Sequence, residues 1–490
     1  MRFRSCLVLV ITACLLGSSA RGQTTQPATD YFAIYLQGKK VGYAMNRRTP
    51  AEGKVRTTAF VFMTLGRGGL NISVTTTTHT EETADGKPLR LSHSQNLAAM
   101  SESVRGKIVN GKLEATITTG GQTRTQTLDW PAGALLPEGA ELLARKHGLA
   151  EGTRYSYKHF APDSLSAYDV SVIVGPKKAV DLLGRVVTLV EVRQTLAAAT
   201  GKIEAITYVD EDYKPLKTVT QALGMQIEMI ACSREFARSQ NEDVSDFLDK
   251  FFLASPQRLT GLSAAKSATY EIHPANGGKA ENLNFRPTDS QSVRRGGGGT
   301  VFVTVRPVSP PAGATLPYQG RDEQALAAMK PTRTLQSDNE KIIALARKAA
   351  SDATDAATAA RRMEKFVKDY IHAKDLSVGY ATAAEVAENR QGDCTEHAVL
   401  LAAMLRSAGI PAQVVTGVTY AESFGGRNAI FAPHAWVRAR IGEKWVDYDA
   451  ALGFDAGHIA LSWGDGESDD FFAVANTLGY FKIVKATLEK

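Results

Sequence analysis

The cysteine with the most reactive setting in this sequence is Cys394, which follows Gly392 and Asp393. Asp393 and Glu396 have the spacing of a capping box, and the residues after them are apolar as far as Leu405, which predicts a buried helix that starts at the cysteine. A helix N-terminus carries partial positive charge and unpaired N–H groups, which lower the pKa of a thiol and can hold an oxyanion. The position therefore favours a nucleophile.

A thiolate nucleophile needs a general base, and the base needs a group that orients it. Residues 433–441 and 444–449 alternate in polarity with period two, which is typical of strands. Between them, Gly442-Glu443 suits the two-residue loop of a type II′ hairpin. The sequence therefore predicts a hairpin in which Ile441 lies opposite Lys444.

The register of this hairpin distinguishes two aspartates. Arg438 falls opposite Asp447 and Trp436 opposite Asp449, and all four share one face with His434. Asp449 is diagonal to His434, at roughly 7–8 Å, which an imidazole and a carboxylate can bridge. Asp447 has a nearer partner in Arg438. We therefore expect His434 to be the base and Asp449, not Asp447, to orient it.

Two other roles for these side chains are open. Cys394, His397, His434 and Asp449 are all zinc-ligand types, but Cys-x-x-His within one helix does not match common structural zinc spacings. A disulfide between Cys394 and Cys232 is the second alternative. We expect no metal and no cofactor.

The motifs GDCTEH (residues 392–397), RSAGIP (406–411), HAWV (434–437) and WVDYD (445–449) follow one another in this order. In sequence and order they resemble the transglutaminase-like superfamily, and FDAGHI (454–459) resembles the segment that follows in bacterial members. The similarity covers about residues 335–465. One departure is Ala450, where many bacterial members have proline, and it should not disturb the carboxylate.

The resemblance implies a papain-like α+β fold and a catalytic triad of Cys394, His434 and Asp449. The thiolate would attack an amide carbonyl of a protein or peptide, and His434 would protonate the leaving amine to give a thioester. Attack by water makes the protein a protease or amidase, whereas attack by an amine makes it an acyltransferase. The sequence leaves this choice open, because it depends on how the pocket excludes water.

Several neighbouring residues have two interpretations. Trp436, Trp445 and His397 could shape the substrate pocket or pack in the core. Residues 420–431, which contain Gly425-Gly426, are expected to be a loop that borders the site or a plain connector.

The elements that must position the site are expected within residues 331–490, the transglutaminase-like domain. A capping-box pattern at Ser337–Glu340 starts the first expected helix, Asp355 caps a second, and a short third spans about Ala381–Glu388. Together with the hairpin, these helices predict an α+β domain.

The rest of the chain has different patterns. Residues 23–240 are rich in Val, Ile and Thr runs, and Asn110-Gly111 is a hairpin signal, so we expect an N-terminal antiparallel β-rich domain, as a curved sheet or open barrel. Its expected role is structural, or binding of a cell-envelope partner. Residues 241–330 are expected to be a connecting region with short strands, one of them at Thr300–Arg306, and a Pro/Gly-rich linker.

The first 22 residues have a basic start and a short apolar run, Cys6–Leu16, which predicts a secretory signal peptide and a secreted or periplasmic protein. Membrane attachment would require lipidation at Cys14 or an uncleaved anchor. Cleavage removes three arginines and no acid, which lowers the formal net charge from +6 to +3. So small a charge on a chain of 490 residues does not indicate a nucleic-acid partner.

Two function classes follow. The first is an exported thiol enzyme that acts on amide bonds through Cys394, His434 and Asp449. The second is a cell-envelope binding or scaffold protein, in which the papain-like domain recognises a partner and turnover is incidental.

Overall fold

The computed structural model describes residues 28–67, 70–97, 100–119, 121–198, 201–222, 225–242, 252–275, 283, 285–372, 381–424, 426–466, 477–478 and 480–490. The chain divides into two compact units, residues 1–66 with 71–245 and residues 67–70 with 246–490. The expected signal peptide, including Cys14, lies outside the described residues. Among the helices that are described, none has both the length and the apolar character needed to cross a membrane.

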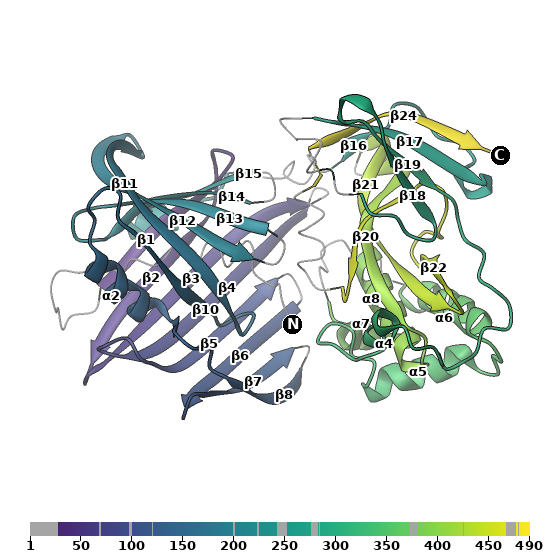
Figure 1. The fold of residues 1–490 in the computed structure, drawn as a ribbon, viewed down its shortest axis with the longest axis horizontal. Coiled ribbons are helices and arrows are strands. Elements are labelled where there is room, and N and C mark those ends of the chain that lie inside the picture. The colour runs from purple at the N-terminus through teal and green to yellow at the C-terminus, as the bar shows by residue number, and fades with distance from the viewer. Residues whose placement is uncertain are drawn as a thin grey trace. The chain divides into compact units, whose positions relative to one another are not determined.

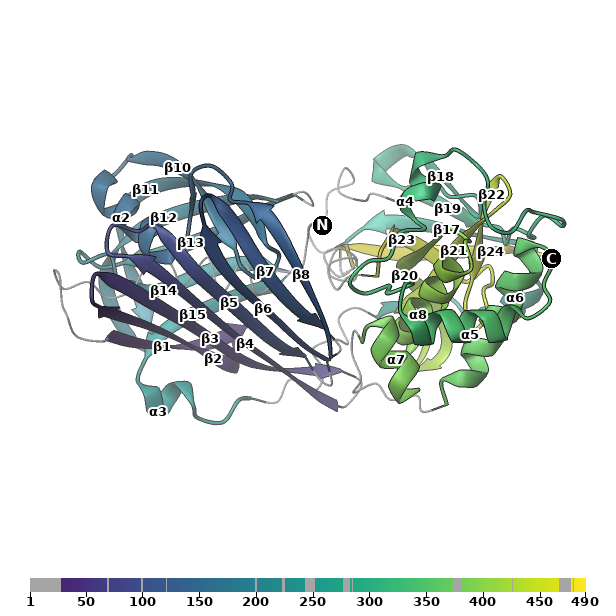
Figure 2. The same cartoon turned by 90° about the horizontal axis from the view of Figure 1, so that it is seen from below.

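The first unit is built around one sheet of 15 strands (Figures 1 and 2). The strands are β1 (Ala28–Leu36), β2 (Lys39–Ala51), β3 (Lys54–Arg67), β4 (Leu70–Thr83), β5 (Pro88–Leu97), β6 (Met100–Val109), β7 (Lys112–Thr119), β8 (Gln122–Asp129), β9 (Ala134–Leu135), β10 (Arg154–Ala161), β11 (Ser166–Leu182), β12 (Arg185–Ala198), β13 (Gly201–Val209), β14 (Pro215–Ala222) and β15 (Met225–Cys232). Among the described residues of this unit, two helices accompany the strands, α2 (Pro137–His147) and α3 (Arg234–Ala237).

Sequence neighbours pair within β1–β8 and within β9–β15, and one further pair, β1 with β15, joins these two halves. The order therefore runs from β8 down to β1, then from β15 down to β9. The hairpin expected at Asn110-Gly111 is present, with Val109 opposite Lys112. Figure 2 shows β1–β8 as a broad layer and β10–β13 curling over it. Leu91, Val104 and Leu113 of β5–β7 accordingly share a core with Phe160 of β10.

A buried carboxylate attaches α2 to this sheet. Glu82 of β4 accepts the backbone N–H groups of Glu138 at 2.8 Å and Gly139 at 2.9 Å, in the first turn of the helix. Arg48 of β2 forms a two-pronged ion pair with the Glu138 side chain, at 2.8 and 2.6 Å. Burial raises the pKa of Glu82 to about 7.

This pKa predicts an unusual pH dependence of stability. Between pH 4.5 and 7 the folded unit holds the Glu82 proton and the unfolded chain releases it, so the contribution of Glu82 falls as pH rises. Relative to Glu82→Gln, the wild type should lose up to about 3 kcal/mol of unfolding free energy across this range. Urea titrations that follow the fluorescence of Trp130, which stacks on Phe160 in this unit, measure the unfolding free energies of the two proteins at each pH. Parallel pH curves for the two proteins would contradict the expectation.

The second unit contains two sheets and five α-helices among its described residues (Figure 1). Its strands are β16 (Leu253–Ala254), β17 (Ser267–Pro274), β18 (Gln291–Arg295), β19 (Val301–Val305), β20 (Ala412–Phe424), β21 (Arg427–Ile441), β22 (Lys444–Tyr448), β23 (His458–Gly464) and β24 (Phe481–Glu489). Its helices are α4 (Glu323–Ala327), α5 (Glu340–Ala350), α6 (Ala356–Tyr370), α7 (Ala383–Asn389) and α8 (Cys394–Ser407), with 3-10 turns η2 (Leu262–Ala264) and η4 (Gly297–Gly299).

One sheet has the order β16-β21-β20-β23, with β22 paired to β21, and the other has the order β18-β19-β17-β24. The second sheet draws three strands from residues 241–330, which we expected to be a connecting region. They belong to the second unit because β17 pairs with both β19 and β24. The second unit thus includes short strands of the expected connecting region as well as residues 331–490.

The helix that starts at Cys394 is the centre of this unit. Residues 395–406 of α8 are all buried, and the helix packs against β21 and against α5, α6 and α7. Arg406 is buried with them because its guanidinium donates to the carbonyls of Ala412 and Lys330 and to the carboxylate of Asp465. A buried arginine is tolerated when its donors are paired in this way.

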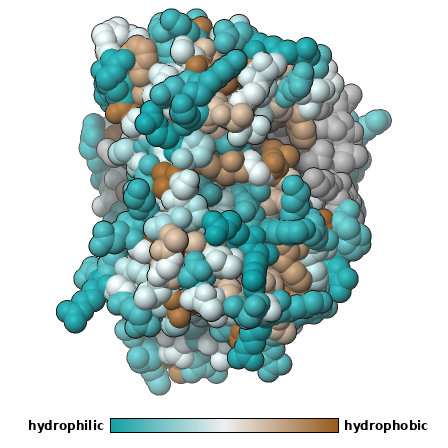
Figure 3. All heavy atoms as spheres, turned by 90° about the vertical axis from the view of Figure 1, so that its right-hand side faces the viewer, coloured by the Kyte–Doolittle hydropathy of each residue, from teal (hydrophilic) through white to brown (hydrophobic). Residues whose placement is uncertain are grey.

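The neighbouring helices start near the expected places. Asp355 caps α6, as predicted, and Thr382 caps α7. Helix α5 differs slightly, because Asn339 rather than Ser337 accepts the N–H groups of Lys341 and Ile342. On the face that Figure 3 shows, hydrophobic residues lie scattered among hydrophilic ones, as is usual for protein surfaces.

Candidate active site

The start of α8 has the predicted capping box. The Asp393 carboxylate accepts the N–H of Thr395 at 2.9 Å, and the Glu396 carboxylate accepts the N–H of Asp393 at 2.9 Å. Cys394 is therefore the first residue of the helix, where the dipole and the first-turn N–H groups favour a thiolate over a thiol.

Glu396 links the start of α8 to the segment before α7 through hydrogen bonds. Its side chain is fully buried, and its second oxygen accepts the N–H of Ala381 at 3.0 Å. Burial, together with the neighbouring Asp393 carboxylate, raises the pKa of Glu396 well above its ordinary value. Glu396 thus joins the segment before α7 to the turn that carries Cys394.

The hairpin formed by β21 and β22 has the predicted register. Ile441 lies opposite Lys444 and Arg438 opposite Asp447. Gly442 has a φ of 60°, as the first position of a type II′ turn requires. Because β22 ends at Tyr448, Asp449 is the first residue after the strand, and its side chain points toward β21.

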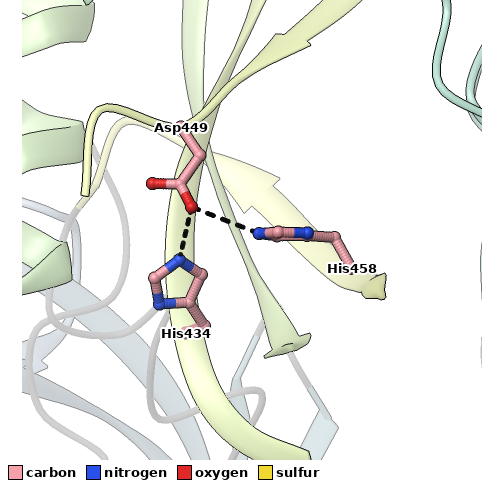
Figure 4. A group of neighbouring side chains, drawn as sticks. All are labelled: His434, Asp449 and His458. Carbon is pink, nitrogen blue, oxygen red and sulfur yellow. Dashed lines mark hydrogen bonds and ion pairs between the residues drawn. The ribbon is translucent and has the colours of Figure 1, made fainter. Parts of the chain in front are cut away.

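His434 and Asp449 lie in direct contact, as the diagonal position predicts. Nε2 of His434 is 2.9 Å from Oδ2 of Asp449, and both residues are buried (Figure 4). Burial alone would raise the pKa of Asp449, but the adjacent histidines hold it far below its usual range. An ionised Asp449 therefore accepts a hydrogen bond from Nε2–H of His434, which leaves Nδ1 of His434 as the nitrogen that can accept a proton from a thiol.

Two further contacts fix Asp449. Its other oxygen accepts the N–H of Ala451 at 2.9 Å, and Glu364 of α6 accepts the N–H of Asp449 at 2.8 Å. Burial raises the pKa of Glu364. A helix far away in sequence thus helps to place the carboxylate.

The expected pairing of Asp447 with Arg438 is wrong at the side-chain level, although the register is right. Asp447 accepts the indole N–H of Trp436 at 2.8 Å and the hydroxyl of Ser290. Arg438 donates instead to Gln413, at 3.0 and 2.6 Å, and lies 3.9 Å from the ring centre of Trp463. Stacking on a planar ring suits a guanidinium, and the neutral amide satisfies its donors.

Residues from the expected connecting region support this hairpin. Asp289 accepts the N–H of Trp445 at 2.8 Å, and the side chain of Gln291 pairs with both backbone groups of Ala460, at 3.0 and 2.8 Å. Together with the Ser290–Asp447 contact, they fasten β22 and β23 from one side. No local pattern in the sequence signals these long-range contacts.

The structure distinguishes between the two interpretations of Trp436, Trp445 and His397. Trp436 and Trp445 are buried, which places both in the core. His397 is also buried, and its Nδ1 is 2.6 Å from the carbonyl oxygen of Asp393, so it serves the helix start. In the stretch 420–431, residues 420–424 belong to β20 and residues 427–431 to β21, and the two strands pair with each other.

The structure also bears on the two alternatives for Cys394. Both Cys232 and Cys394 are thiols, so the disulfide is not formed. A metal-like grouping does occur, but with His458 in place of Cys394 and His397: the ligand atoms of His434, Asp449 and His458 lie within 4.8 Å of one another. Hydrogen bonds from both histidines to Asp449 account for this grouping without an ion.

His458 is the site residue that the sequence reasoning missed. Its Nε2 lies 3.2 Å from the same Asp449 oxygen that His434 contacts. The only signal for it was its place in the FDAGHI motif, residues 454–459. Nothing in the local pattern assigned that histidine to the site.

Comparison with protein families matches residues 343–450 to the model of the transglutaminase-like superfamily. Residues 343–450 are a transglutaminase-like domain. The match includes Cys394, His434 and Asp449, and it ends before His458. The transglutaminase-like domain thus occupies part of the second unit, and the strands β17–β19 and β24 lie outside the matched range. The curated proteins contain no match to the chain.

Solved structures similar to this chain include three with low identity. One, described as a "putative cysteine protease" from Cytophaga hutchinsonii, is 17% identical, with 46% of this chain and 84% of that chain covered and a TM-score of 0.30. A β-barrel-like protein of a domain of unknown function from Brucella abortus is 13% identical, with 42% and 96% covered and a TM-score of 0.34. A "putative protease" from Parabacteroides distasonis is 13% identical, with 75% and 69% covered and a TM-score of 0.20.

Proposed function

We propose that the transglutaminase-like domain is a thiol enzyme that acts on amide bonds of proteins or peptides, with Cys394 as nucleophile, His434 as base and Asp449 as the orienting carboxylate. The observation that carries this proposal is the buried His434–Asp449 hydrogen bond at 2.9 Å. His434 lies on β21, and α8 packs against this strand. Cys394 is the first residue of α8.

The chemistry follows from these positions. Nδ1 of His434 takes the thiol proton, and the imidazolium is stabilised through Nε2 by Asp449. The thiolate attacks the amide carbonyl, and the N–H groups in the first turn of α8 stabilise the oxyanion. His434 then protonates the leaving amine, and the acyl group remains on sulfur as a thioester. Water completes hydrolysis, whereas a primary amine completes acyl transfer.

We further propose that the protein is exported and that its β-rich first unit binds a cell-envelope partner. The support for export is the basic and apolar pattern of residues 1–22. The support for a binding role is that the first unit contains none of the three proposed catalytic residues.

A labelled primary amine, incubated with cell-envelope protein extract and either the wild type or Cys394→Ala, tests the proposal. Wild-type-dependent labelling of proteins indicates acyl transfer, and wild-type-dependent new N-termini indicate proteolysis. Cys394→Ala should abolish both, because it removes the thiol on which the proposed thioester forms. If the two proteins give identical patterns, the enzyme proposal fails and the domain acts as a binding module.

A further inference from the structure

A second histidine contacts the proposed orienting carboxylate. Nε2 of His434 and Nε2 of His458 lie 2.9 and 3.2 Å from one oxygen, Oδ2 of Asp449. Figure 4 shows the two rings approaching this oxygen from different directions, one from β21 and the other from the start of β23.

The contacts of His458 favour a ring that carries a proton on Nε2. Its Nδ1 faces Asp455, whose side-chain oxygen is 3.0 Å away and whose backbone N–H and carbonyl are each 3.3 Å away. In the cation, both nitrogens donate, Nε2–H to Asp449 and Nδ1–H to Asp455. Each neutral tautomer would instead point a lone pair at one of the two carboxylates, which is unfavourable.

The ring of His458 has little freedom to turn. It is almost completely buried, and it packs against the rings of Phe454 and Trp436, with centres 4.8 and 5.2 Å away. Its backbone is held in the sheet opposite Thr419 of β20. These contacts hold His458 in place as a hydrogen-bond donor to Asp449.

We propose that His458 is a positioning residue, whose Nε2–H fixes the Asp449 carboxylate in the orientation that accepts the hydrogen bond from Nε2–H of His434. This inference rests on the proposed function of the site. With His458 in place, three donors hold the carboxylate: two imidazoles at Oδ2 and the N–H of Ala451 at Oδ1. Without it, His434 alone would hold Oδ2, and the carboxylate could rotate away.

Four titratable groups from the neighbouring elements surround His458. Asp449 follows β22, Asp455 precedes β23, and His434 lies on β21. Asp447 on β22 also acts on His458 electrostatically. These four groups would together shape any pH profile of the site.

The test uses the rate at which iodoacetamide alkylates Cys394, because this rate needs no substrate and reports the thiolate population. It is measured against pH on the full chain, at the Cys394 peptide, so that Cys232 does not interfere. His458→Gln retains an N–H donor near the position of Nε2, and His458→Phe fills the ring space without a donor. At pH 6 we expect His458→Gln to react within about threefold of the wild type and His458→Phe about tenfold more slowly. The profile of His458→Phe should also shift toward that of His434→Ala.

Each other outcome overturns the inference. If His458→Phe reacts like the wild type, Asp449 needs no second donor. If both His458 variants slow equally while circular dichroism shows them folded, the ring matters for packing only. A wild-type thiol that titrates near 8.5 and ignores His434→Ala overturns the proposed function as well. A thiol that depends on His434 and Asp449 but not on His458 overturns this inference alone.

A second measurement does not depend on any variant folding. Nitrogen-15 NMR of the wild type labelled at histidine reports which ring nitrogen of each histidine carries the proton. The inference requires a protonated Nε2 in His458. An unprotonated Nε2 there would overturn it.

Discussion

Asp449→Asn is expected to slow the amide-bond reaction at least about 100-fold, whereas Asp447→Asn should slow it less than about tenfold. Asparagine at 449 can still accept a hydrogen bond, but it loses the negative charge that stabilises the His434 imidazolium. The pKa of Asp449 is held far below its usual range, so this charge is present at every working pH. The rate of release of a labelled amine from a peptide amide measures the effect.

Asp447→Asn is the matched control, because it makes the same chemical change two residues away. Asp447 does not contact His434; it accepts the indole N–H of Trp436 and the hydroxyl of Ser290, and burial raises its pKa. An asparagine can keep the contact with Trp436. Equal losses in the two variants, with unchanged thermal unfolding, would show that Asp449 is not the orienting group.

Gly392→Ala is the second large effect, and it should inactivate the protein nearly as fully as Cys394→Ala. Gly392 has a φ of 149°, and an added Cβ would lie 2.2 Å from Cβ of Glu396, a distance that real atoms do not tolerate. Glu396 cannot move aside, since its carboxylate holds the N–H groups of Asp393 and Ala381 in the core. The start of α8, and Cys394 with it, must shift.

The expected cost of Gly392→Ala is about 3 kcal/mol of unfolding free energy, because overpacking adds to backbone strain. Gly426→Ala is the control, since Gly426 has a φ of 75° but an added Cβ would meet nothing within 4 Å. That variant should cost about 1 kcal/mol and retain activity. Guanidinium titrations that follow the tryptophan fluorescence of the second unit give both values. Equal costs in the two variants would contradict a clash at Glu396.

The parts of the site that were predictable are those written in short stretches of sequence. Asp393 and Glu396 predicted the start of α8, because the two residues of a capping box are only three positions apart in the sequence. The alternation around Gly442-Glu443 set the register of β21 with β22, and with it the diagonal contact of Asp449 with His434.

What could not be predicted depends on contacts between distant segments. Ser290 reaches Asp447 across 157 residues, and Gln291 reaches Ala460 across 169. Arg438 donates to the Gln413 side chain and stacks on the Trp463 ring, although Asp447 lies directly opposite it. Tertiary packing decides between such partners, because the strand register leaves them equally near. The pairing of β1 with β15 likewise joins segments about 200 residues apart, which no local pattern encodes.

The pairing of β17 with β24 affects when the second unit can fold during translation. Ser267 bonds Glu489 at a separation of 222 residues, and Cys394, His434 and Asp449 all lie between these two strands in the sequence. A chain emerging from the ribosome therefore carries its thiol well before β24 exists, and this sheet cannot close until β24 has been made. Contacts of such long range fold slowly. The unit that contains the proposed nucleophile is thus completed only after β24, Phe481–Glu489, has been translated.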